Sequence, residues 1–447
     1  MLISAIMGLL VQWKDHNVSL MSKHPFTLST TGRGLRVCML VANDMVSDPR
    51  VTRHAETLGC NGFKVTVVCF QSQGTVARET RENHSIIRVS GRIIRFAEIL
   101  SRMGRRPTTR TNTGNVNGSV APRTRKGVAR LLVVVAVIAL RQLALFRAAR
   151  KTGAHVYCAN DLDTLPAAIL AAGFDRKVVY DAHELWPEMI TAPPFYRKIA
   201  RTFEGFLARR VDLVMTVNEM IANVLASRYS INLPIHIYNC PRVGMRKRAV
   251  RRTRKRGPKV VLYQGVYHPQ RGLENLVKAS RLLLSDVRLV LRGYGAIENQ
   301  LRELARGMTN VSFVPPVPME RLVDAARVAD VGIVPYLPTN LNNYLASPNK
   351  LFEYIHAGLP VAASNMPFAR KLVEENGIGV VFDARDVRSI AQGLNRITRP
   401  SQLRRFQLNL IAAAAKYNWQ VEALKLLRSY AQFRDAFQGG KNELASA

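Results

Sequence analysis

The sequence predicts an α/β protein made of two doubly wound, Rossmann-like domains that face each other across a cleft. Its 447 residues are too many for one ordinary domain and suit two domains of about 200 residues each. Short apolar runs of strand length alternate with amphipathic stretches, and this alternation restarts after a basic segment at residues 241–258. Apolar strands that alternate with helices are typical of parallel sheets covered on both faces.

The first domain is expected at residues 35–240. Its first strand begins at Arg36 and leads into an amphipathic stretch that Gly62 ends. Further strands are expected at 64–70, 154–161, 177–184, 211–218 and 235–241, with a helix at 164–172. Residues 1–34 are expected to form an N-terminal extension, and a basic loop is expected at 102–127.

The second domain is expected at residues 259–410 and repeats the pattern. Strands are predicted at 259–265, 287–295, 311–316, 331–336, 360–364 and 379–383, and helices near 273–284, 297–306, 319–329 and 351–358. Ligands of such sheets bind at the carboxyl ends of the strands, so residues directly after the apolar runs are the candidate site residues.

The chain is strongly basic, with 65 Lys and Arg against 31 Asp and Glu and a net charge of +34. Such a surface attracts phosphates, nucleic acid or anionic lipid, although an arginine-favouring source explains the same excess. Part of the excess lies in two runs, 92–126 and 241–259, which we interpret as exposed loops or linkers. Neither run has interleaved aromatic residues, so we expect peripheral contact with an anionic membrane but no nucleic-acid partner.

Cysteine usage and two apolar stretches bear on location. Five scattered cysteines without a CxxC pair indicate neither a disulfide framework nor a zinc site, which favours the cytoplasm. Residues 1–12 lack the basic start of a signal peptide and are too short to span a membrane. The segment 131–140 is about half the length of a spanning helix. We expect a buried helix there, with an interfacial membrane helix as the alternative.

Two features could bind a nucleotide. The chain has no G-x-G-x-x-G after a first strand and no G-x-x-x-x-G-K-[ST], which disfavours a dehydrogenase and a phosphate-loop NTPase. Gly293 and Gly295 follow a strand and precede a helix, where a bare backbone can approach a ligand. A tight turn without a ligand explains them equally well.

The second feature is the segment 344–361, YLASPNKLFEYIHAGLPV, which predicts a helix with Pro348 near its first turn and Ser347 as its cap. A helix N-terminus with Lys350 in the first turn suits a diphosphate. Glu353, one turn later, could accept hydrogen bonds from ribose hydroxyls. Alternatively, Lys350 and Glu353 are an ordinary pair on a solvated helix face.

Residues 347–364, SPNKLFEYIHAGLPVAAS, closely resemble the nucleotide-sugar segment of the group 1 glycosyltransferases, the family 4 retaining enzymes with the GT-B fold. The similarity covers about residues 35–430 and continues, in family order, through segments at 41–58, 158–172, 178–188, 263–279 and 329–336. The resemblance implies an acceptor-side first domain and a second domain that binds the nucleotide sugar. It also implies that a helix at 411–432 returns to the first domain before a tail at 433–447.

By this resemblance the protein moves a sugar to a carbohydrate or lipid-linked acceptor, with retention, in cell-surface polysaccharide or glycolipid synthesis. Glu353 would hold the donor ribose and Arg271 would neutralise the diphosphate. The full donor-binding set that the resemblance implies is Gly265, Arg271, Arg292, Gly293, Gly295, Ser347, Asn349, Lys350 and Glu353. No cofactor or metal is implied, because basic residues and a helix dipole stabilise the leaving diphosphate, and the nucleotide sugar is the substrate.

On the first-domain side, the catalytic candidates are Asn160 and Asp161, facing the transferred sugar, and His183 at a second polar position. A structural histidine is the alternative for His183. Arg50 matches a loop near the cleft, with a plain surface loop as the alternative, and Trp419 is expected to be a packing residue.

Three positions depart from the family pattern. Leu345 replaces a frequent acid, Val266 replaces an arginine, and Asn160 replaces a histidine. Two other functions therefore stay open. One is a nonhydrolysing sugar-nucleotide epimerase, and the other is a catalytically inactive binding protein of the same fold.

Overall fold

The computed structural model describes residues 34–46, 48–90, 125–189, 194–242 and 257–445, which form two compact α/β units. The N-terminal unit holds the described residues of Leu28–Asp181, Arg210–Leu213 and Phe433–Ala447. The C-terminal unit holds those of Ala182–Arg209 and Val214–Gln432. The expected extension at 1–34, basic loop at 102–127 and linker at 241–258 lie almost entirely outside the described residues.

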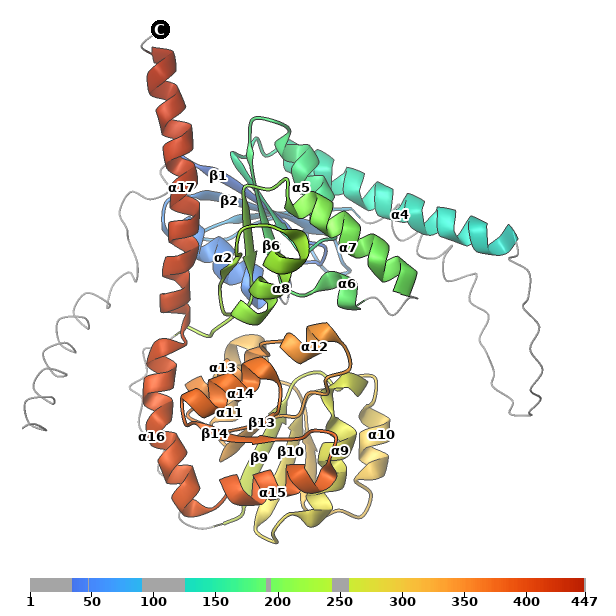
Figure 1. Cartoon of the computed structure of the whole chain (residues 1–447), viewed down its shortest axis with the longest axis vertical. Helices are drawn as coiled ribbons and strands as arrows, with labels where there is room; N and C mark the ends of the chain where they lie inside the picture. The colour runs from blue at the N-terminus through green and yellow to red at the C-terminus, as the bar shows by residue number, and fades with distance from the viewer. Residues whose placement is uncertain (1–33, 47, 91–124, 190–193, 243–256, 446–447) are drawn as a thin grey trace, which may run out of the picture. The chain divides into compact units, whose positions relative to one another are not determined.

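The first sheet has eight strands in the order β3-β4-β2-β1-β5-β6-β7-β8. Figure 1 labels β1, β2 and β6 of this sheet. Its strands are β1 Arg36–Leu40, β2 Lys64–Phe70, β3 Arg78–Thr80, β4 Ser85–Val89, β5 Val156–Asn160, β6 Lys177–Ala182, β7 Leu213–Thr216 and β8 Ile235–His236. Its helices are α2 Pro49–Cys60, α4 Arg125–Arg150, α5 Leu165–Ala172, α6 Trp186–Met189, α7 Pro194–Ala208 and α8 Glu219–Tyr229. β1 pairs in parallel with both β2 and β5, as a doubly wound sheet requires, whereas β3 pairs antiparallel with β4.

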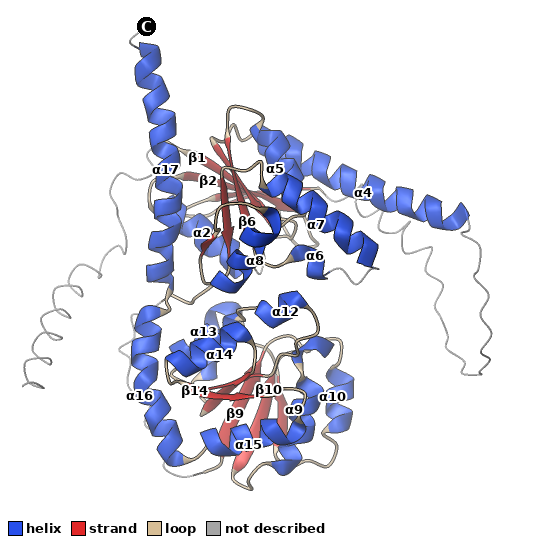
Figure 2. Cartoon of the chain, viewed as in Figure 1, coloured by secondary structure: helices blue, strands red, loops and turns tan. Residues whose placement is uncertain are grey.

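The second sheet has six strands in the order β11-β10-β9-β12-β13-β14, drawn in red among blue helices in Figure 2. Its strands are β9 Lys259–Gln264, β10 Val287–Arg292, β11 Val311–Val314, β12 Val331–Val334, β13 Val361–Ser364 and β14 Gly379–Phe382. The α-helices of this part are α9 Leu273–Ala279, α10 Glu298–Leu304, α11 Leu322–Ala326, α12 Leu341–Leu345, α13 Asn349–Ala357, α14 Pro367–Glu375, α15 Val387–Ile397, α16 Pro400–Lys416 and α17 Trp419–Ala445. Three short 3₁₀ turns lie at Pro269–Arg271, Ser280–Leu282 and Met319–Arg321.

The second sheet is apolar on both faces, and successive residues of one strand enter different cores. Val361 and Ala363 belong to the core that α13, α14 and α16 cover, while Ala362 lies in the core under α9, α10 and α15. This alternation follows from the two-residue period of a strand. The prediction of two doubly wound α/β domains is therefore confirmed.

Two sequence expectations are wrong in detail. The strand expected at 235–241 is limited to Ile235–His236. The buried helix expected at 131–140 is part of α4, whose side chains at Val134, Val135, Ile138 and Leu140 are 40–54% exposed. Burial in this helix begins further along, at Leu145. In the part of the chain that the structure describes, no helix is both long and apolar enough to cross a membrane. Trp419 is 3% exposed, as a packing residue should be.

Candidate functional site

The helix α13 begins one residue later than its sequence suggests. Its N-cap is Pro348, whose ring carries no acceptor that could cap the first turn. The expected cap, Ser347, has another partner, because its Oγ accepts a hydrogen bond from the side-chain amide of Asn218 at 3.1 Å. The prediction that Ser347 caps this helix is therefore wrong. The N–H groups of an uncapped first turn are the donors that an anion can use.

Tyr354 fixes α13 against the second sheet. Its ring lies over Gly332 of β12, where an added Cβ would come within 2.2 Å of the ring. The Tyr354 hydroxyl accepts a hydrogen bond from the backbone N–H of Gln264, the last residue of β9, at 3.0 Å. The helix is thus held on two neighbouring strands, and its polar side chains lie beside the ends of those strands.

Two cations of the predicted set meet on one phenol. The Lys350 ammonium donates a hydrogen bond to the Tyr336 hydroxyl at 2.9 Å, and the Arg271 guanidinium lies 3.9 Å from the centre of the same ring. Lys350 also lies 5.2 Å from the ring centre of Tyr263. None of these three contacts was predicted from the sequence. The phenol ring positions both positive charges without neutralising them.

The charges and hydrogen bonds around Lys350 keep its ammonium group protonated. Burial opposes ionisation of Tyr336, but the charges of Lys350 and Arg271 and the hydrogen bond from Lys350 outweigh it and lower the pKa of the phenol. Burial likewise opposes the ammonium of Lys350, yet the neighbouring oxygens of Tyr336 and Tyr263 raise the pKa of Lys350 above its usual value. Lys350 therefore remains a cation at neutral pH.

Glu353 is held by a chain of hydrogen-bonded side chains that runs from Arg292, the last residue of β10, through Gln264, the last residue of β9. Its Oε2 accepts a hydrogen bond from the Gln264 amide at 2.8 Å. The carbonyl oxygen of that amide accepts one from Arg292 Nη1 at 3.4 Å. Gln264 is 1% exposed, so this relay is fixed inside the C-terminal unit. It orients a half-buried carboxylate one turn after Lys350.

The glycines of the predicted set are required by close backbone contacts. At Gly293, with φ +154°, an added Cβ would lie 2.0 Å from the carbonyl oxygen of Gly265. At Gly265 the nearest atom would be the Lys350 ammonium nitrogen, at 3.2 Å. Gly295 packs in the same way against the backbone of Tyr267. Protein packing alone therefore explains Gly293 and Gly295. At Gly265 the bare backbone instead faces Lys350, the lysine predicted to bind the diphosphate.

Two further predicted residues of the C-terminal unit, Asn349 and His183, have surroundings different from those of Lys350 and Glu353. Asn349 is exposed at the start of α13 and accepts a hydrogen bond from Asn239 at 3.2 Å. His183 is half-buried directly after β6, and its neighbour Glu184 accepts a hydrogen bond from Asn342 at 3.1 Å. Burial raises the pKa of Glu184, although the charges of Arg271 and His183 partly oppose the change.

The N-terminal unit contains Asn160 and Asp161, the last residue of β5 and the one that follows. Asn160 is 2% exposed and donates a hydrogen bond to the carbonyl oxygen of Leu40 at 2.9 Å. Among the described residues, the side-chain oxygen Oδ1 of Asn160 accepts no hydrogen bond. Asp161 has φ +67°, a left-handed conformation that non-glycine residues adopt mostly at functional turns.

Arg50 was expected in a loop, either near the cleft or on the plain surface, but the structure places it in a helix. It is the second residue of α2, 3% exposed, and binds Asp181 through two hydrogen bonds of 2.9 and 2.7 Å. His54, one turn further along α2, places Nδ1 3.5 Å from the same carboxylate. This buried cluster is a structural feature of the N-terminal unit.

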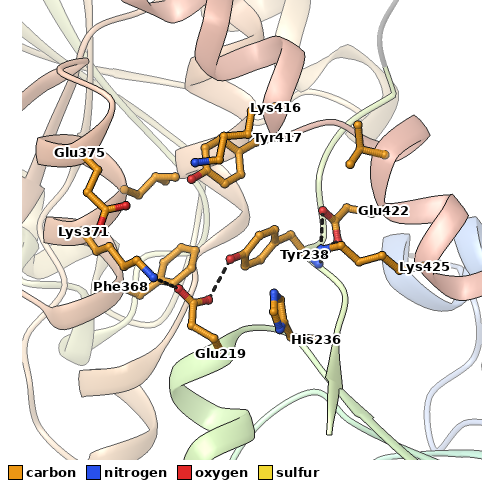
Figure 3. Close-up of a pocket in the computed structure, with 12 residues that line it drawn as sticks. Glu219, His236, Tyr238, Phe368, Lys371, Glu375, Lys416, Tyr417, Glu422 and Lys425 are labelled. Atoms are coloured by element: carbon orange, nitrogen blue, oxygen red, sulfur yellow. Dashed lines mark hydrogen bonds and ion pairs between the residues drawn. The ribbon is translucent and has the colours of Figure 1, made fainter. Parts of the chain in front are cut away.

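A separate cavity of about 320 Å³ surrounds Tyr238 (Figure 3). The Tyr238 hydroxyl donates to Glu219 at 2.8 Å, and Glu219 pairs with Lys371. The Tyr238 backbone N–H donates to Glu422, which pairs with Lys425. These charges satisfy one another across the cavity, and the predicted donor residues are not among those that line it.

Two family models match the chain. Residues 258–399 match the model described as "Glycosyl transferases group 1", and residues 47–239 match a "Glycosyl transferase 4-like domain".

Curated relatives match over part of their length. A phosphatidyl-myo-inositol mannosyltransferase of Mycobacterium leprae is 30% identical over 194 residues, which are 42% of this chain and 50% of that protein. A D-inositol 3-phosphate glycosyltransferase of Streptosporangium roseum is 29% identical over 193 residues, covering 38% of this chain and 42% of the relative. The chain thus spans about half the length of the curated relatives that it matches.

Solved structures show the same fold at lower identity. The sucrose-phosphate synthase of Thermosynechococcus elongatus superposes with a TM-score of 0.67 at 18% identity, covering 90% of this chain and 100% of the other. Anabaena HepE, solved with UDP and glucose, gives a TM-score of 0.62 at 14% identity with the same coverage.

Proposed function

Because the chain belongs to the group 1 glycosyltransferases and has the GT-B fold, we propose that it moves a sugar from a nucleotide diphosphate sugar to an acceptor, with retention of configuration. One observation carries the donor assignment. Lys350 and Arg271 both lie against Tyr336 beside the uncapped N-terminus of α13, and Glu353 follows one turn later. This arrangement offers two cations and free N–H donors to a diphosphate, and a carboxylate to a ribose.

The chemistry requires stabilisation of the leaving nucleoside diphosphate. Negative charge on the β-phosphate grows as the bond from the sugar to the phosphate oxygen breaks. Lys350, Arg271 and the α13 N-terminus are fixed before the reaction, so they can stabilise that charge without reorganising and without a metal ion. Asn160, Asp161 and His183 are proposed to contact the transferred sugar. We assign no protein nucleophile and no general base.

The acceptor is proposed to be a carbohydrate or a lipid-linked molecule of a cell-surface polysaccharide or glycolipid pathway. The name of one curated relative, a phosphatidyl-myo-inositol mannosyltransferase, supports a lipid-linked acceptor. The net charge of +34 also favours an acceptor displayed on an anionic membrane. We therefore propose a cytoplasmic protein that binds peripherally at the inner face of the membrane.

A thermal-shift titration with UDP, GDP, ADP and their sugar conjugates tests the donor site. We expect at least one nucleoside diphosphate to raise the Tm of the wild type and to have no effect on Glu353→Ala. Glu374→Ala, which removes an exposed acid of α14, is the matched control and should respond like the wild type. The donor site is wrong if no nucleotide stabilises the wild type or if Glu353→Ala responds fully.

The stabilising nucleotide sugar can then be incubated with and without candidate acceptors and followed by NMR. Transfer with retention predicts a glycoside whose anomeric coupling matches that of the donor. Formation of an epimer without an acceptor would instead identify a sugar-nucleotide epimerase.

A further inference from the structure

Helix α7 exposes most of its large apolar side chains to solvent and buries its one acid, the reverse of an ordinary surface helix. Phe195, Tyr196, Ile199, Phe203 and Phe206, which we call the α7 apolar face, are 46–68% exposed. Their spacing places them on one side of the helix, because residues three, four, seven and eight apart share a face. Monomeric proteins in water rarely leave such a continuous apolar surface uncovered.

The opposite side of α7 is fixed by polar and close contacts, so the helix cannot simply turn over. Glu204 is fully buried and accepts a hydrogen bond from the Tyr229 hydroxyl at 2.5 Å. Gly205 packs against the Tyr229 ring, where an added Cβ would come within 2.7 Å of the ring. Arg201 forms an ion pair of 2.8 Å with Glu188 of α6. The outward orientation of the apolar face is therefore built into the C-terminal unit.

The charges on α7 indicate what covers this face. Glu204 is the acid of the helix and it is buried, so no acid of α7 reaches solvent beside the apolar face. The exposed Lys198 gives this face a positive flank, whereas Arg201 is paired with Glu188 on the opposite side. Helices that lie in the interface of an anionic bilayer have this combination, because the apolar side enters the acyl region while the bases meet lipid phosphates.

We propose that α7 docks the protein on an anionic membrane, with the α7 apolar face inserted among the lipids. The inference rests on the membrane contact proposed above and assigns it to one helix. The N-terminal unit provides independent support, because α4 has no acid in its 26 residues and also exposes large apolar side chains. A membrane accounts for apolar exposure on both helices without a specific protein partner for each.

Co-sedimentation with vesicles tests the proposal. The wild type should sediment with vesicles of phosphatidylcholine mixed with phosphatidylglycerol, and high salt or phosphatidylcholine alone should weaken binding. The variant Phe195→Ser, Tyr196→Ser, Ile199→Ser, Phe203→Ser should lower the partition coefficient at least about tenfold. A matched control replaces four side chains of similar exposure elsewhere in the same unit, Leu282→Ser, Leu284→Ser, Leu408→Ser, Ile411→Ser, and should bind like the wild type.

Three outcomes overturn the proposal. The first is that the wild type fails to sediment with anionic vesicles, and the second is that the two quadruple variants bind vesicles equally. The third is that light scattering shows a dimer that only the α7 variant abolishes. The last result would make this face an interface between copies. The nucleotide thermal shift of the α7 variant should stay at the wild-type value. Loss of vesicle binding with an intact nucleotide response separates membrane docking from the donor site.

Discussion

Charged side chains lie near the strand ends of both sheets, but they have different surroundings in the two units. In the N-terminal unit, Arg50 and Asp181 form a buried pair with side chains 4% and 0% exposed. In the C-terminal unit, Lys350 is half-buried, and its described contacts are with the phenols of Tyr336 and Tyr263. A charge that is fully paired stabilises the fold, whereas a charge held by neutral groups keeps its capacity to bind a ligand. The following predictions test that distinction.

The largest effect should come from Arg50→Ala. Removing one partner leaves the Asp181 carboxylate buried without its guanidinium, which should lower the free energy of unfolding by about 3–5 kcal/mol. Arg81→Ala is the control, since its pair with Glu79 is about one-third exposed and should contribute less than about 1 kcal/mol. Urea unfolding of the three proteins measures both values. Equal losses would show that the buried pair has no special structural role.

Lys350→Ala should weaken binding of a nucleoside diphosphate by about 1.5–3 kcal/mol, or about 10- to 150-fold, through loss of a charge-assisted contact. Isothermal titration calorimetry measures the change, with Lys371→Ala as the control because that lysine pairs with Glu219 at the other cavity. The unfolding free energy should change little. If Lys350→Ala lowered stability as much as Arg50→Ala while binding stayed normal, the distinction between the units would fail.

Tyr336→Phe should have a smaller effect on the same affinity. The ring that supports Arg271 remains, but the hydroxyl that orients Lys350 is lost, so the affinity should fall by about 1 kcal/mol, or about fivefold. Tyr336→Leu should weaken binding further, since it also removes the ring. Identical affinities for wild type and both variants would mean that the phenol does not position the cations.

Glu184→Gln should have the smallest effect, visible only as a change in pH dependence. The raised pKa of Glu184 means that the folded protein favours the protonated carboxyl. The associated stability is present below the ordinary pKa of glutamate, about 4.3, and is lost as the pH rises through the raised folded value. Urea midpoints measured from acid to neutral pH should therefore fall less steeply for the variant. Parallel profiles would contradict this.

Most strands were predictable because they are short, mainly apolar runs that stand out from their polar flanks. The hairpin of β3 and β4 and the helix α7 were not predicted. β3 has only three residues, too few to show a period. The apolar residues of α7 do recur at helical spacing, but nothing in the sequence shows that this side of the helix faces solvent.

The candidate site was predictable only in part. The positions of Lys350 and Glu353 follow from a local motif, and the structure places both beside the strand ends. The expectation that Ser347 is the cap fails because the helix begins at Asn349 and not at Pro348. Tyr336 and Gln264 lie at the ends of apolar runs and read as strand residues. The partner of Arg50 is 131 residues away, and no local pattern reveals such a pair.

The contact between Gly332 and Tyr354 limits how this protein could be re-engineered. Exchanging α13 for the equivalent helix of another enzyme is an obvious route to a new donor preference. Such a graft would succeed only if the incoming aromatic ring found a strand position without a side chain beneath it, as Tyr354 does at Gly332. The transferable module is therefore the helix together with the glycine of β12, two segments separated in the chain that would have to be exchanged together.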